Sequence, residues 1–329
     1  MQFYTKQHKF YCGIDLHTKK MYVCVLDEKG EIREHRNMNT NPESFLAAIA
    51  PFREDVVVAV ECMFTWYWLA DLCQKEGIPF VLGHALYMKA IHGGKAKNDK
   101  IDSKKIAVLL RGGMIPMSYV YPEKMRATRD LMRRRNHLMR KRAELLAHIQ
   151  NTNSQYNLDE PFGCIAVPKR RGDIVGAFDH PAVKKSMEVN LRVIETYDVL
   201  LADLERTILK LANQHDPVSY ALLQSVYGIG RIGALTILYE IENIKRFPRV
   251  QDFVSYARLV KCEKSSAGKN YGTSGAKIGN AHLKWAFSEA AVLFLRNNEP
   301  AKKYMEKLTR KHGKGKALSI LAHKLGRAV

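Results

Sequence analysis

The most constraining feature of this sequence is a change in apolar periodicity near Pro122. Before it, "FYCGIDL", "MYVCVLD" and "EIREHR" alternate as half-buried strands do, and the unbroken apolar run "VVVAVE" is typical of a strand buried on both faces. "IPFVLG" predicts a further strand, while "FTWYWLADLCQKEG" and "SKKIAVLLRGG" have helical spacing and end at glycines. Strands interleaved with helices predict an α/β domain over residues 1–121.

After Pro122 the sequence predicts helices. Residues 122–156 carry leucines seven positions apart at Leu131, Leu138 and Leu145, and residues 186–214 have similar heptad-like spacing. Two such helices can pair as a coiled coil between subunits, or form an ordinary helical hairpin. This helical segment spans residues 122–216.

The last segment, residues 217–329, is predicted to be mainly helical. "LLQSVYGIGRIGALTILYEIEN" predicts two helices joined by a Gly-x-Gly turn. This element resembles a helix–hairpin–helix, whose turn offers N–H groups to a phosphate, although a plain helical corner would have the same pattern. "CEKSSAGKNYGTSGAKIGN" predicts a loop, and "AHLKWAFSEAAVLFLRNN" an amphipathic helix.

The net charge of +20 indicates a polyanionic partner. Nucleic acid is the first expectation and an anionic membrane surface the second, but no apolar run is long enough to span a membrane, and the stretch "MQFYTKQHKFYCGIDL" does not have the apolar core expected of a signal sequence. Six scattered cysteines without a CxxC pair predict reduced, mostly buried thiols in a cytosolic protein, and no zinc site.

Four carboxylates fall where strands or a helix would bring them together. Asp15 and Glu61 close two predicted strands, and Asp99 and Asp102 face the same way on a first helical turn. If the strands are neighbours, the four acids can bind divalent Mg²⁺ or Mn²⁺, which prefer oxygen ligands. Three of the acids also have a structural alternative: a turn cap at Asp15, and helix capping or counter-charges to nearby lysines at Asp99 and Asp102.

Four motifs, in order, resemble the transposases of the IS-one-ten insertion-sequence family. They are "YCGIDLHTKKMYVCVLDEKG", "VVVAVECMFTWYW", "KAKNDKIDSKKIAVLL" and "SVYGIGRIGALTILYEIENIKRFPRVQDFVSYARLV", and the resemblance runs from about Phe10 to Val329. It implies an RNase H-like (RuvC-like) mixed sheet with helices over residues 1–121, then a coiled-coil helical hairpin. A mainly helical C-terminal transposase domain follows.

Residue by residue, the family's catalytic and metal-binding acids fall on Asp15, Glu61, Asp99 and Asp102. The sequence departs from the family pattern after Glu61, where "VEC" replaces the commoner continuation to Thr-Gly, and "NDKIDSKK" replaces K-T-D-x-x-D-A. All four acids and the spacing of the aspartate pair are retained.

The family also uses a serine nucleophile in a C-terminal loop. That pattern, a serine before a small residue and glycine, selects Ser266, with the adjacent Ser265 and the more distant Ser274 as alternatives. The resemblance implies Mg²⁺-assisted transesterification of DNA through a 5′-phosphoserine link. It further implies a homo-oligomer, a dimer or dimer of dimers, in which different subunits supply the serine and the acids.

Members of the family work with a structured non-coding guide RNA that pairs with donor and target double-stranded DNA. The DNA sequence is then recognised by base pairing with the RNA, and the protein recognises the shape and the backbone of the nucleic acid. Localisation in the cytoplasm of a bacterium or archaeon, associated with the nucleoid, is expected. The basic residues predicted to contact nucleic acid are Lys95, Lys97, Lys100, Arg133, Arg134, Arg135, Arg140, Arg142, Lys169, Arg170, Arg171, Lys269 and Lys277.

Two other functions fit parts of the pattern. A metal-dependent RuvC-like endonuclease, such as a junction resolvase, would use the four acids for hydrolysis and would not need the serine. A non-enzymatic architectural protein would use the basic helices alone, so that the change Asp102→Asn would leave its function intact.

Overall fold

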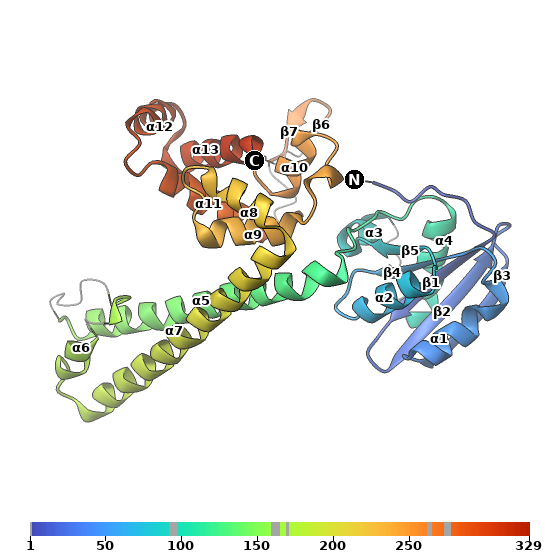
Figure 1. Ribbon diagram of the computed structural model, residues 1–329, viewed down its shortest axis with the longest axis horizontal. Helices are drawn as coiled ribbons and strands as arrows, with labels where there is room; N and C mark the ends of the chain where they lie inside the picture. The colour runs from blue at the N-terminus through green and yellow to red at the C-terminus, as the bar shows by residue number, and fades with distance from the viewer. Residues whose placement is uncertain (1, 92–97, 159–164, 169–170, 262–264, 273–277) are drawn as a thin grey trace. The chain divides into compact units, whose positions relative to one another are not determined.

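The computed structural model describes residues 2–91, 98–158, 165–168, 171–261, 265–272 and 278–329. The chain forms two compact units, Met1–Pro122 and Glu123–Val329. The first is mixed α/β and the second is almost entirely helical (Figure 1).

The first unit is built on a five-stranded mixed sheet in the order β3-β2-β1-β4-β5. The strands are β1 (Phe10–Leu16), β2 (Lys20–Asp27), β3 (Ile32–Asn39), β4 (Val56–Glu61) and β5 (Phe80–Gly83). Strands β1, β2 and β3 form an antiparallel meander, and β4 and β5 continue the sheet parallel to β1. All five predicted strands are therefore confirmed.

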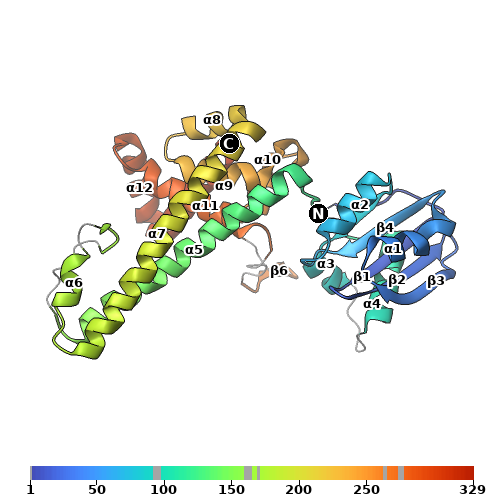
Figure 2. The same cartoon turned by 60° about the horizontal axis from the view of Figure 1, so that its bottom comes forward.

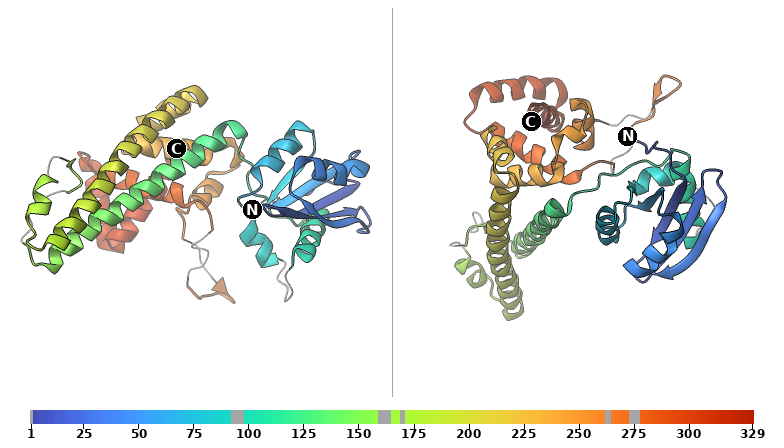
Figure 3. Two further views of the ribbon diagram at one scale, coloured as in Figure 1. Left: turned by 90° about the horizontal axis from the view of Figure 1, so that it is seen from below. Right: turned by 45° about the vertical axis from the view of Figure 1, so that its right-hand side comes forward.

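Helices cover both faces of this sheet (Figure 3). Cys12, Ile14 and Val58 point toward α1 (Pro42–Ile49) and α2 (Tyr67–Lys75). Tyr11 and Val57 point toward α3 (Ala85–Ile91) and α4 (Asp99–Arg111). Because side chains alternate along a strand, the apolar residues are divided between two cores, one on each face of the sheet. A short 3₁₀ turn, η1 (Ala50–Phe52), precedes β4.

The second unit begins with two long helices, α5 (Glu123–Gln155) and α7 (Pro181–His215), joined through the short α6 (Gly172–Gly176). They lie side by side in Figures 1 and 2. Arg135 pairs with Glu205, and Arg142 further along pairs with Asp198, so the helices run antiparallel. Within one chain, the two predicted heptad segments therefore form a helical hairpin.

The remaining helices form a bundle next to this hairpin, which α8 and α9 contact directly. They are α8 (Pro217–Ser225), α9 (Arg231–Ile241), α10 (Val250–Tyr256), α11 (Ala281–Phe294), α12 (Glu299–His312) and α13 (Lys314–Ala328), with a 3₁₀ turn η3 (Ile244–Arg246). Their core centres on α9, whose residues from Ala234 to Ile241 are all buried. The predicted helix–turn–helix at the Gly-x-Gly segment is present as α8 and α9.

The segment predicted as a loop before α11 contains a small hairpin. Strands β6 (Ser265–Ser266) and β7 (Lys269–Asn270) pair antiparallel around a two-residue turn. Ala267 and Gly268 both have positive φ, at 49° and 74°, as a type I′ turn requires. The sequence analysis did not predict this hairpin.

Among the described residues, the helices lack a stretch long and apolar enough to cross a membrane. The cysteines at positions 12, 24 and 73 are buried free thiols, and Cys62 is exposed. Burial raises the pKa of the Cys73 thiol to about 12.

Candidate active site

Asp15 and Glu61 lie at the same edge of the sheet. Strands β1 and β4 are parallel neighbours whose register runs from Phe10 opposite Val56 to Ile14 opposite Val60. The next position on each strand is Asp15 and Glu61. Asp15 lies four positions after Tyr11 and Glu61 four positions after Val57, and both of these apolar residues face α4, so at a period of two the two carboxylates share that face and one edge of the sheet.

Helix α4 approaches this edge with its N-terminus. The Asn98 side chain caps the helix by accepting a hydrogen bond from the Ile101 amide at 2.8 Å, and Asp99 and Asp102 occupy the first turn. Carboxylates are favoured there because the helix dipole places partial positive charge at this end. The helix starts four residues before the predicted "SKKIAVLLRGG" segment, which is why it carries both acids.

The neighbouring charges change the pKa of Asp15. Partial burial raises the pKa of its carboxyl, and the negative charges of Asp99 and Asp102 raise it further, while His17 opposes the shift. Asp102 in turn lies 3.4 Å from the Lys105 ammonium. Asp99 and Asp102 raise the pKa of Asp15 because their negative charges repel its carboxylate, and a bound cation relieves such repulsion.

The sequence analysis missed His17 as a member of this site. Its Nε2 lies 3.4 Å from Asp15 Oδ1 and 3.7 Å from Asp99 Oδ1. One ligand atom from each of these three residues lies within 4.8 Å of the others. The available signal was the position of His17 two residues after Asp15, in a segment interpreted only as a turn.

The predicted nucleophile, Ser266, lies on the β6–β7 hairpin of the second unit. Ser266 is paired with Lys269 and Ser265 with Asn270, and both serines are exposed. Side chains directly opposite on an antiparallel pair share a face. The predicted contact residue Lys269 therefore shares a face with Ser266, while Ser274 lies outside the described residues.

Comparison with known proteins identifies the family. A DEDD transposase profile of the IS110 group matches residues 12–157, and a profile described as "Transposase IS116/IS110/IS902 family" matches residues 220–306. The transposase for insertion sequence element IS1111A of Coxiella burnetii is 22% identical over 321 residues, which cover 95% of this chain and 86% of that protein. The chain belongs to the IS116/IS110/IS902 family of transposases.

A second relative has the same kind of description. The y4qE protein of Sinorhizobium fredii, described as a transposase, is 23% identical over 295 residues, which cover 85% of this chain and 70% of that protein. The resemblance found in the sequence is thereby confirmed. Membership of a transposase family makes the chain an enzyme, so the non-enzymatic alternative is wrong.

In this transposase, several arginines predicted to contact nucleic acid are engaged by carboxylates of the second unit. Arg135 and Arg171 are buried. The ion pairs are Arg133–Glu240 at 2.7 Å, Arg135–Glu205 at 2.7 Å, Arg142–Asp198 at 2.6 Å and Arg171–Asp198 at 2.7 Å. These four arginines hold helices together, whereas Arg134, Arg140 and Lys100 are exposed. Lys95, Lys97, Lys169, Arg170 and Lys277 lie outside the described residues.

The buried carboxylate of this group, Glu240 on α9, joins three parts of the transposase's second unit. It accepts hydrogen bonds from Arg129 at 3.0 Å, from Arg133 at 2.7 Å, and from Asn280 Nδ2 at 2.7 Å. Burial alone would raise the pKa of Glu240, but the hydrogen bond from Arg133 and the charges of Arg129 and Arg133 lower it to about 2. Asn280 caps α11 at the end of the segment that contains Ser266.

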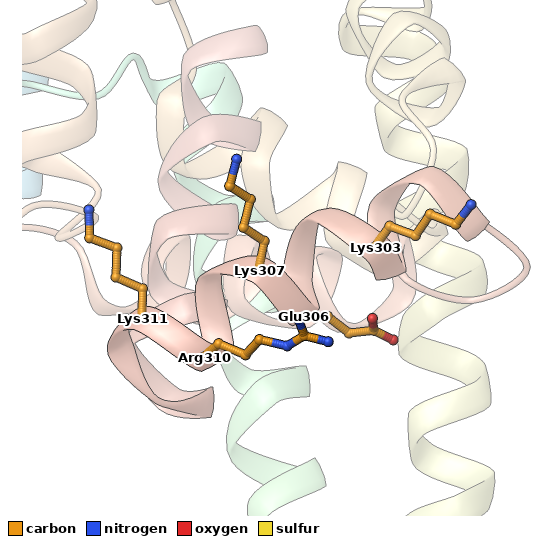
Figure 4. Close-up of a pocket in the computed structure, with 5 residues that line it drawn as sticks. All are labelled: Lys303, Glu306, Lys307, Arg310 and Lys311. Atoms are coloured by element: carbon orange, nitrogen blue, oxygen red, sulfur yellow. The ribbon is translucent and has the colours of Figure 1, made fainter.

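The transposase has a cationic surface on α12 that the sequence analysis did not single out. On α12, Lys303, Lys307, Arg310 and Lys311 follow helical spacing along one face and, with Glu306, line a surface hollow (Figure 4). All four cations are exposed. The four are joined to no carboxylate by any ion pair among the described residues, so this basic face is available to an external anion.

Proposed function

We propose that this transposase cuts and rejoins double-stranded DNA at a divalent metal centre held by Asp15, Glu61, Asp99 and Asp102. The observation that carries the proposal is the convergence of β1, β4 and the first turn of α4 at one edge of the sheet. The order of the four acids agrees with the DEDD of the matching profile. The strand order β3-β2-β1-β4-β5 supports an RNase H-like (RuvC-like) fold for the first unit.

The donor set suits Mg²⁺ or Mn²⁺. Both ions favour carboxylate oxygens, and the acids concentrate negative charge around Asp15. When bound, such an ion polarises a phosphodiester and neutralises charge that develops on it. The protein's own part is to hold the carboxylates in place through the sheet register and the packing of α4.

The nucleophile in this proposal is the hydroxyl of Ser266. Its Oγ attacks a DNA phosphorus, the Oγ–P bond forms, and the bond from phosphorus to the 3′ oxygen breaks. The serine loses its proton and the leaving 3′ oxygen gains one, which gives a 5′-phosphoserine link and a free 3′-OH. Attack by another 3′-OH reverses these changes on a new strand, so phosphoester bonds are conserved and ATP is not needed.

The hairpin favours Ser266 over Ser265 for this role. Lys269 is opposite Ser266, whereas the residue opposite Ser265 is the neutral Asn270, whose side chain accepts a hydrogen bond from Gly272. A lysine ammonium beside the hydroxyl stabilises a developing oxyanion and attracts a phosphate.

The oligomer and the RNA belong to the same proposal. We expect a dimer or a dimer of dimers, with the serine and the acids of one site supplied by different subunits. A structured guide RNA would read donor and target DNA by base pairing. The charge of +20 and the exposed Arg134, Arg140 and basic face of α12 support contacts to nucleic-acid backbones.

The test is a cleavage reaction with labelled duplex DNA, Mg²⁺ and the flanking non-coding RNA. We expect a protein–DNA adduct that survives denaturation, is lost in Ser266→Ala, and is kept in the matched control Ser265→Ala. Asp99→Asn should abolish cleavage and retain DNA binding. Cleavage by Ser266→Ala without an adduct would instead establish hydrolysis by a RuvC-like endonuclease such as a junction resolvase.

A further inference from the structure

His17 lies between two of the proposed metal ligands. Its Nε2 is 3.4 Å from Asp15 Oδ1 and 3.7 Å from Asp99 Oδ1. For a six-coordinate ion with bonds of about 2.1 Å, adjacent donors are about 3 Å apart and opposite donors about 4 Å apart. Both measured separations fall between these limits, and one ligand atom from each of the three residues lies within 4.8 Å of the others, so the three side chains are close enough to share one ion.

The backbone of His17 is fixed on both sides. Its N–H donates to the Lys20 carbonyl at 3.1 Å, and its own carbonyl accepts from the Thr40 hydroxyl at 2.9 Å. The preceding carbonyl, of Leu16, accepts from the Thr65 hydroxyl at 3.0 Å. The imidazole therefore projects from a preorganised turn at the end of β1, which lowers the entropic cost of ligation.

The contacts of His17 differ from those of an ordinary histidine–aspartate pair in the same unit. His8 Nδ1 lies 2.6 Å from a single acid, Asp55, at hydrogen-bonding distance. His17 instead stands at longer distances from two acids, and its side chain is 58% exposed. An exposed ion pair of that kind contributes little to stability, so pairing alone does not account for the arrangement.

We infer that His17 is a nitrogen ligand of the metal centre, beside Asp15 and Asp99, and shifts its preference from Mg²⁺ toward first-row transition ions. Mg²⁺ prefers oxygen donors, whereas imidazole nitrogen binds transition ions strongly, with Co²⁺ above Mn²⁺ in the usual order of affinity. A centre of carboxylates plus one imidazole is then selective through ligand type. The inference rests on the proposed metal centre and adds a ligand that determines its specificity.

The test is Mn²⁺ binding by the full-length protein, followed by electron paramagnetic resonance without any DNA. We expect pulsed spectra of the bound Mn²⁺ to show coupling to a ligand ¹⁴N. His17→Ala and His17→Gln should lose this coupling and weaken Mn²⁺ binding by about 10- to 100-fold, a loss of the size that removal of a ligand's supporting partner already causes. Mg²⁺ binding, measured by competition, should weaken less. The control His8→Ala removes a matched histidine outside the site and should keep the coupling.

Three outcomes would overturn the inference: no nitrogen coupling in the wild type, coupling that persists in both His17 variants, or tighter Mn²⁺ binding without His17. The last would mean that the imidazole competes with the metal for the carboxylates. Asp99→Asn separates this from the proposed function. If that variant loses Mn²⁺ while His17→Ala binds normally, the metal centre stands and only the His17 ligand is wrong; if Asp99→Asn binds Mn²⁺ normally, the metal centre is wrong as well.

Discussion

Gly13 lies so close to Ala107 that a Cβ atom on the glycine would come within 2.3 Å of the Ala107 amide nitrogen. The same atom would lie 2.4 Å from the Ser103 carbonyl oxygen. Both contacts are to the backbone of α4, so the helix itself would have to move. Because the first turn of α4 carries Asp99 and Asp102, the missing side chain at position 13 sets how near these acids come to Asp15.

We therefore expect Gly13→Ala to damage the proposed metal centre without altering any of its proposed ligands. The added methyl group should lower the free energy of unfolding by about 1–3 kcal/mol, as overpacking does, and should weaken Mn²⁺ binding. Urea denaturation and a Mn²⁺ titration measure the two effects. The control is Gly233→Ala in α9, where the new atom meets only Ile229 Cγ2 at 3.7 Å. Unchanged Mn²⁺ affinity in Gly13→Ala would show that this contact does not position the acids.

The acids of the candidate site could be singled out from the sequence because their positions follow local rules. Asp15 and Glu61 end apolar strands, and Asp99 and Asp102 are three residues apart in a helix, so period and spacing alone place each one on its element. That β1 and β4 are adjacent is a tertiary fact, which the sequence analysis could state only as a condition. The register from Phe10–Val56 to Ile14–Val60 meets that condition.

Other features depend on contacts that local patterns do not encode. The sequence predicts that Arg135 and Arg142 contact nucleic acid, but the antiparallel register of α5 and α7 puts Glu205 and Asp198 beside them. A helix pair has many possible registers, and charge composition does not select among them. His17 was missed for a similar reason, because its closeness to Asp99 depends on where α4 begins.

Lys269 provides a test of the serine hairpin. Its position opposite Ser266 predicts that Lys269→Ala slows formation of the protein–DNA adduct by about 10- to 1,000-fold, up to the range found when one oxyanion-stabilising donor is lost. Lys269→Arg keeps the charge and should retain part of the rate. Single-turnover adduct formation at saturating DNA separates this effect from weaker binding. If Lys269→Ala lowered only the affinity for DNA, Lys269 would contact the DNA backbone without assisting the chemical step.

Glu240 makes the stability of the second unit depend on pH. Because the folded pKa of about 2 lies below the ordinary value of 4.5, the ionised carboxylate stabilises the fold above pH 4.5, and this contribution disappears as the pH falls toward 2. The difference corresponds to about 3 kcal/mol at neutral pH. Urea denaturation should show Glu240→Gln less stable than the wild type by about that amount at pH 7, with the gap closing between pH 4.5 and pH 2.

The control for this measurement is Asp203→Asn, which removes an exposed carboxylate paired with Arg206 at 3.4 Å. Its stability should follow that of the wild type at every pH, because exposed pairs contribute little. A constant gap between Glu240→Gln and the wild type from pH 7 to pH 2 would mean that the arginines do not depress the pKa of Glu240.

The basic face of α12 should bind the phosphate backbone of DNA, without preference for the DNA sequence. Lys307 and Arg310 both line the hollow in Figure 4, and each phosphate contact releases about 0.9 of a counterion from duplex DNA. The double variant Lys307→Ala/Arg310→Ala should therefore weaken binding to all duplexes alike and reduce the slope of log affinity against log salt concentration by about 2. Fluorescence anisotropy over a salt series measures both. Lys302→Ala is the matched control, since Lys302 already pairs with Glu299 at 2.5 Å; an equal loss of slope in that variant would show that general charge, and not this face, binds the DNA.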